Sequence, residues 1–152
     1  MSIFRKTVVL VLTMGPGLAG AVAEAADDPI VTRQAIMASA NAAAALGGGM
    51  MKGEVAYSPV AGKSVIATLR AASLSYGSFF PEGSDQGNTW AKPAIWEDPD
   101  GFAAKLTAFQ AATAKANAAS GKEGPADLEA FKAAVGPVFG ICKSCHETYR
   151  KN

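Results

Sequence analysis

The only two cysteines and the only histidine of this 152-residue chain lie in one short stretch, from Cys142 to His146. Its sequence, Cys-Lys-Ser-Cys-His, has the C-x-x-C-H spacing that is typical of covalent haem attachment. Two thiols one helical turn apart can each add to a vinyl group on one edge of a porphyrin, and the next residue offers an imidazole to the iron. We therefore predict one haem c, bound covalently through Cys142 and Cys145, with His146 as the proximal metal ligand.

Other interpretations of this stretch fit the residues less well. A redox dithiol of the thioredoxin type begins a helix after a strand, whereas Cys142 falls near the end of a helical pattern with no strand pattern before it. A structural zinc site takes four ligands, so a carboxylate would have to join the three Cys and His residues. A disulfide between Cys142 and Cys145 would leave the adjoining His146 unexplained.

Four segments with helical spacing can position this motif. Each begins at or near a proline, and three of these prolines follow a Ser or Asp that can cap a helix: Asp28-Pro29, Ser58-Pro59, Asp98-Pro99 and Gly124-Pro125. We expect the first helix to stop at Gly47–Gly49 or a little beyond. In the fourth, Pro137 is expected to kink the helix rather than end it.

The apolar spacing within these segments defines the fold class. The third segment has an amphipathic face that includes Phe102, Leu106 and Phe109, and the fourth carries its own apolar face into the two cysteines. Residues 78–97 are rich in Gly, Pro and polar residues but also contain aromatic residues, so we expect them to fold over one end of the domain. The sequence predicts an all-α, antiparallel up-down-up-down four-helix bundle, with the haem near the C-terminal end of the fourth helix.

This topology brings a candidate distal ligand to the same end as the motif. His146 lies roughly 6 Å from the end of the fourth helix, and Met37 roughly 12 Å from the start of the first. Met37 is therefore the candidate for the second axial position, although methionine also fills gaps in apolar cores without binding iron. Arg33 lies one turn before Met37 and could pair with a haem propionate, or be a solvated surface charge.

The N-terminus predicts the compartment. Arg5 and Lys6 precede the apolar run Val8–Met14, and small residues at A-x-A spacing follow in Ala21–Ala25, which is the layout of a secretory signal peptide. The apolar part is shorter than a membrane-spanning helix of ~20 residues. We predict a signal peptide over residues 1–25, one domain over residues 26–152, a periplasmic location and no membrane anchor after cleavage. With 14 basic and 13 acidic residues and no basic patch, nucleic-acid binding is not expected.

Several of these residues carry a resemblance to a known family. The run from Cys142 to Arg150 matches the pattern C-K-x-C-H-x-x-Y-R, and Arg33–Met37 is similar to the R-Q-x-x segment that precedes the distal residue. Phe80–Ser84 and Lys92–Trp96 also resemble the connection between the second and third helices. Over essentially the whole mature chain, the sequence resembles the class II c-type cytochromes, which include the cytochrome c′ and cytochrome c556 types.

This resemblance assigns roles to the predicted residues. It implies thioether bonds at both cysteines and His146 as proximal ligand, with Arg33 and Gln34 near the propionates and Arg150 close to the proximal side of the haem. Met37 falls at the distal position. Members of the cytochrome c′ type leave the iron five-coordinate, whereas members of the c556 type bind a methionine.

Two functions follow as expectations. The first is a periplasmic electron carrier with His146 and Met37 as iron ligands, since such ligation suits one-electron transfer. Its partners would be periplasmic redox proteins. The alternative is a five-coordinate cytochrome c′ that binds nitric oxide or carbon monoxide at a vacant distal site. An enzyme is not expected, because no second histidine can act as a distal base. Family members often dimerise through the first two helices, so a homodimer is retained as an alternative assembly.

Overall fold

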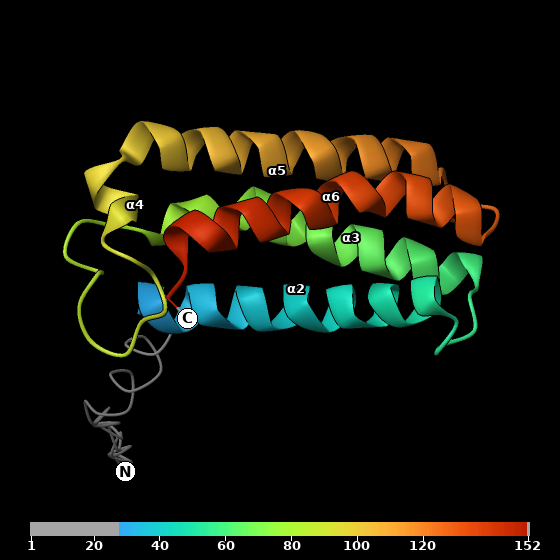
Figure 1. Cartoon of the computed structure of the whole chain (residues 1–152), viewed down its shortest axis with the longest axis horizontal. Helices are drawn as coiled ribbons and strands as arrows, with labels where there is room; N and C mark the ends of the chain where they lie inside the picture. Colours follow the sequence, from blue (N-terminus) through green and yellow to red (C-terminus); the bar gives the residue numbers. More distant parts are fainter. Residues whose placement is uncertain (1–27, 152) are drawn as a thin grey trace, which may run out of the picture.

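The computed structural model describes residues 28–151 (Figure 1); the predicted signal peptide, residues 1–25, lies outside them. The described residues form four long helices, α2 (Pro29–Lys52), α3 (Pro59–Ser75), α5 (Pro99–Ser120) and α6 (Leu128–Tyr149). Successive long helices run in opposite directions along one axis (Figure 1). The predicted all-α antiparallel four-helix bundle is confirmed.

The predicted capping residues start three of the four helices. The side chains of Asp28, Ser58 and Asp98 accept hydrogen bonds of 2.8, 3.2 and 3.0 Å from backbone N–H groups two or three residues further on. The fourth helix begins later than expected. Its N-cap is Asp127, and Pro125 lies before the helix. The helix is capped by Asp127 rather than by Gly124 because an aspartate side chain can accept hydrogen bonds from the first N–H groups of a helix, whereas glycine has no side chain to do so.

The triple glycine is part of α2 rather than its end. The helix continues to Lys52 and ends at Gly53, whose φ of 78° is the left-handed conformation typical of a C-cap. A Cβ on Gly47 would lie only 3.3 Å from the rings or methyls of Phe131 and Val65, so this glycine allows close packing of the helices. Pro137 lies within α6, which continues past it as expected.

The buried residues form two clusters. The larger follows the bundle axis and includes the fully buried Met50 and Phe131. The smaller lies at one end and contains Phe102 and Tyr149, with Phe80 packed against it. The connection between α3 and α5 includes two short helices, η1 (Tyr76–Phe79) and α4 (Ala94–Glu97), and it folds over this end of the bundle, as predicted (Figure 1).

Across residues 28–151, none of the helices combines the length and the apolar character that crossing a bilayer requires.

Candidate haem site

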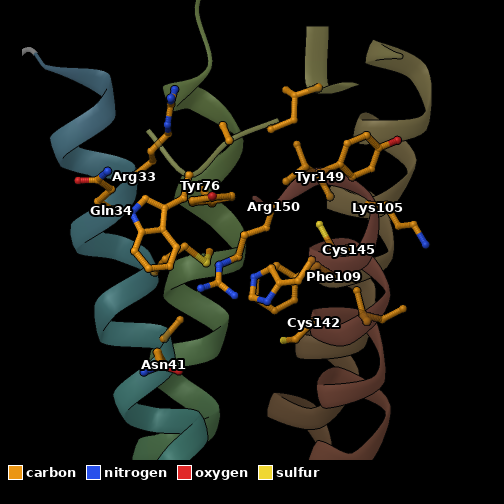
Figure 2. A pocket seen from close by; sticks show the side chains of 18 of the residues that line it. Arg33, Gln34, Asn41, Tyr76, Lys105, Phe109, Cys142, Cys145, Tyr149 and Arg150 are labelled. Carbon is orange, nitrogen blue, oxygen red and sulfur yellow. The ribbon is translucent and has the colours of Figure 1, made fainter. Parts of the chain in front are cut away.

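A cavity of about 720 Å³ opens at the end of the bundle where α2 begins and α6 ends. Figure 2 shows Arg33, Gln34 and Asn41 on the α2 wall and Cys142 and Cys145 on the opposite wall, formed by α6. Residues of α5 and of the connection before it close the remaining sides. The structure brings all the predicted site residues into the lining of this one cavity: Arg33, Gln34, Met37, Cys142, Cys145, His146 and Arg150.

The last two turns of α6 present the C-x-x-C-H motif to the cavity. Both cysteines are half-buried free thiols, and burial is the main cause that raises the pKa of each. His146 follows them in the last turn of the helix. Partial burial in the cavity, and then the positive charge of Arg150, lower the pKa of His146. Both effects favour the neutral imidazole, which is the form that binds a metal.

Arg33 is a buried cation at the end of the cavity. Only 2% of its surface is exposed, so its interpretation as a solvated surface charge is wrong. Its guanidinium donates four hydrogen bonds of 2.6 to 3.1 Å to oxygens of Phe79, Ser84 and Thr89, and it packs 4.8 Å from the ring centroid of Phe80. Burial lowers the pKa of Arg33.

No carboxylate within residues 28–151 forms an ion pair with Arg33. A buried charge is costly unless an opposite charge compensates it. An acidic group on a ligand in the cavity would supply that compensation. The environment of Arg33 therefore fits a haem propionate.

Gln34, on α2, and Arg150, directly after α6, both line the cavity. Gln34 follows Arg33 on α2. Its side-chain amide donates a 2.8 Å hydrogen bond to the carbonyl of Asn88. Arg150, at the end of α6, places its guanidinium 4.7 Å from the ring centroid of Trp90.

Met37 is half-buried on α2 and lines the same cavity as His146 on α6. Met50, by contrast, is fully buried in the larger core cluster and takes no part in the lining. The expectation that the bundle topology brings Met37 and His146 to the same site agrees with these positions.

Sequence reasoning did not identify Tyr76 and Lys105 as site residues. Burial raises the pKa of Tyr76 to about 12, and the phenol lines the cavity beside Arg33 (Figure 2). Lys105 also lines it and donates a 3.2 Å hydrogen bond to the Ser144 hydroxyl. Tyr76 ends the apolar stripe of the second helix, where the bundle meets the long connection. This position is the feature of the sequence that could have identified Tyr76 as a site residue.

These features together fit a haem. The lining is mostly apolar and suits the face of a porphyrin, while two free thiols stand on one wall and an imidazole beside them. The buried Arg33 marks a place for acidic substituents. The fold and the site define a c-type cytochrome built on a four-helix bundle.

Comparison with known proteins agrees with this class. Residues 28–150 match the family model described as Cytochrome C′, and the chain belongs to this family. The predicted class II c-type cytochrome and its covalently bound haem c are thereby confirmed. Its role is electron transfer or gas binding.

Individual relatives cover most of the chain. A cytochrome c-554 of Cereibacter sphaeroides is 42% identical over 108 residues, which are 68% of either protein. The solved structure of cytochrome c prime from Shewanella frigidimarina matches with a TM-score of 0.75 at 30% identity, over 82% of this chain and 95% of that one. The nitric oxide complex of a variant of cytochrome c prime from Alcaligenes xylosoxidans matches with a TM-score of 0.64 at 30% identity, over 83% and 98%.

Proposed function

We propose that this protein binds a diatomic gas, nitric oxide or carbon monoxide, at a haem c held in the cavity between α2 and α6. The observation that carries this proposal is the composition of the α2 wall. Apart from Met37, its central part consists of small side chains, namely Ala38, Ala40, Asn41 and Ala44. Small side chains leave room for a diatomic ligand, and the likeness to a cytochrome c prime solved as a nitric oxide complex supports the same function.

The chain's residues would divide the work of holding the cofactor. Cys142 and Cys145 would anchor one edge through thioether bonds, and His146 would serve as the proximal ligand. Arg33 would compensate the propionate charge, with Gln34 beside it. The bound haem supplies an iron that changes oxidation state and accepts a diatomic ligand. The mostly apolar lining would limit the access of water to the bound group.

Addition of carbon monoxide to the reduced holoprotein tests this function. Rapid, saturable binding, followed by the change in the Soret band, is the expected result. A reduced protein whose spectrum does not respond to carbon monoxide contradicts the proposal.

A specific observation favours a second function, one-electron transfer with Met37 as the sixth ligand. The thioether of Met37 lines the same cavity as His146, and His/Met ligation suits an electron carrier. The ferric protein would then show a methionine–iron charge-transfer band, which Met37→Ala should remove. A high-spin spectrum without this band in the wild type contradicts this second function.

We further propose a periplasmic location, with redox proteins of that compartment as partners. The signal-peptide pattern of residues 1–25 supports this location. N-terminal sequencing of the secreted protein should find the mature chain beginning near residue 26, and an intact leader in that material contradicts the location.

A homodimer through α2 and α3 is the assembly we propose. A shallow groove between these helices is lined mainly by small side chains, which permit close helix contact: Ser39, Ala42, Ala43, Leu46, Ser64, Val65 and Thr68. Sedimentation of the holoprotein should give twice the monomer mass, and Ala42→Arg should reduce it to the monomer. A wild-type monomer at high concentration contradicts this assembly.

A further inference from the structure

Residues 88–92, here called the loop brace, contact the α2 wall of the cavity. The Thr89 hydroxyl accepts a 2.6 Å hydrogen bond from Nη2 of Arg33. The carbonyl of Asn88 accepts a 2.8 Å hydrogen bond from Nε2 of Gln34. Two consecutive residues of the connection are thus joined to two consecutive residues of α2.

The loop brace also pairs with the end of α6. The backbone N–H of Lys151 donates to the carbonyl of Trp90 at 2.8 Å, and that of Lys92 donates to the carbonyl of Tyr149 at 3.0 Å. These bonds flank an isolated antiparallel bridge between Ala91 and Arg150. The loop brace is therefore held to residues 149–151, which lie a few residues after the C-x-x-C-H motif.

Thr89 connects the two sets of contacts. Its hydroxyl bonds to Arg33 and also accepts a 3.2 Å hydrogen bond from the N–H of Ala91. Its carbonyl accepts a 3.1 Å hydrogen bond from Nζ of Lys151. With only 6% of its surface exposed, Thr89 makes these bonds where water competes little. Thr89 thus joins α2 to the segment that follows α6, through its hydroxyl on one side and its backbone carbonyl on the other.

These contacts matter because α2 and α6 form opposite walls of the cavity (Figure 2). We propose that the loop brace fixes the width of the cavity and that Thr89 is its principal positioning residue, acting through Arg33 and Lys151. Met37 belongs to one wall and His146 to the other, so the brace sets the space between them. This inference rests on the proposed function only in taking haem as the occupant.

The test compares Thr89→Val with Thr89→Ser in the holoprotein. Valine keeps the shape of threonine but removes the acceptor, whereas serine retains it. We expect hydrogen exchange at the backbone amides of Lys92 and Lys151 to become about tenfold faster with valine, as the loss of one ordinary hydrogen bond would produce in a local opening equilibrium. Serine should leave both rates near those of the wild type.

A matched control separates the brace from a general loss of stability. Thr113 is buried to a similar degree, at 1% exposure, and its hydroxyl bonds to that of Ser73 at 2.8 Å between α3 and α5. Thr113→Val should destabilise the fold without faster exchange at Lys92 and Lys151 under native conditions. Equal acceleration in both valine variants would overturn the proposal.

The second readout reports on the cavity itself. In Thr89→Val, carbon monoxide should bind the reduced protein severalfold faster than in the wild type. If the wild type binds no carbon monoxide, the gas-binding function fails but the brace is still tested, because valine should then weaken the methionine–iron band and accelerate amide exchange. If valine changes neither amide exchange nor the haem spectrum, the brace is wrong while gas binding stands.

A deletion provides an independent variant in case Thr89→Val does not fold. Removing Lys151 and Asn152 eliminates the bonds from Lys151 to Trp90 and Thr89 and leaves Arg33 and its partners in place. Exchange at the Lys92 amide should again accelerate about tenfold on the same reasoning. Unchanged exchange at Lys92 in the deletion would overturn the proposal.

Discussion

Replacement of Arg33 by methionine tests the buried cation most sharply. The guanidinium donates four hydrogen bonds, and at ~1.5 kcal/mol for each bond from a charged group they contribute roughly 6 kcal/mol. Methionine also removes a buried charge whose desolvation costs several kcal/mol. The loss of the hydrogen bonds outweighs the relief of desolvation, because it leaves the buried carbonyl oxygen of Ser84 without its donor. We expect a net decrease of about 2–3 kcal/mol in the free energy of unfolding.

Urea unfolding of the holoprotein, followed by far-UV circular dichroism, measures this change. Arg70→Met is the matched control, because Arg70 is only half-buried and makes one good hydrogen bond, at 2.9 Å to the carbonyl of Gln110. It should cost about 1 kcal/mol. Equal losses in the two variants, or a more stable Arg33→Met protein, would refute the reasoning that Arg33 anchors the connection over the cavity.

Three further predictions concern the fold and its pH dependence. Phe131→Ala should lower the free energy of unfolding by ~3–5 kcal/mol, because this ring is fully buried between the helices. A loss below ~1 kcal/mol in urea unfolding would contradict this prediction, since it would mean that the neighbouring side chains fill the space left by the ring. Asp98→Ala should cost more than Tyr149→Phe in thermal unfolding, because Asp98 both caps α5 and accepts a 2.9 Å hydrogen bond from the Tyr149 hydroxyl, and equal losses would deny the capping role. The pKa of Tyr76 is raised to about 12 in the folded protein. As the pH rises from about 10 towards 12, the phenol therefore loses its proton in the unfolded chain but keeps it in the folded one, and the free energy of unfolding should fall. Tyr76→Phe should make that fall less steep, and identical pH profiles of the two proteins would contradict the burial of the phenol.

The features predicted correctly from the sequence are those set by local chemistry. Asp28, Ser58 and Asp98 cap helices because the signal and its partner N–H groups lie within three residues. The cysteines and His146 needed only their own spacing. Helical periodicity then placed Met37 and the motif at one end of the bundle. Local rules thus specify the helices, their order and the wall that carries the motif.

The features that sequence reasoning missed depend on distant contacts. Nothing near Arg33 indicates that Thr89, far along the chain, accepts its hydrogen bond. The surroundings of Tyr76 likewise depend on how the connection folds back over the cavity. Gly47 lies inside α2, and nothing near it in the sequence indicates that Phe131 packs closely against its backbone. Each of these outcomes follows from tertiary packing, which overrides local propensity.

The central claim is that Cys142 and Cys145 hold one haem c covalently. The most direct measurement is the intact mass of the protein, produced in a strain that matures c-type cytochromes and denatured before analysis. The account predicts the mass of the chain plus one haem for the wild type, and no added haem for the variant with both Cys142→Ala and Cys145→Ala. A wild-type protein at the mass of the bare polypeptide would contradict it.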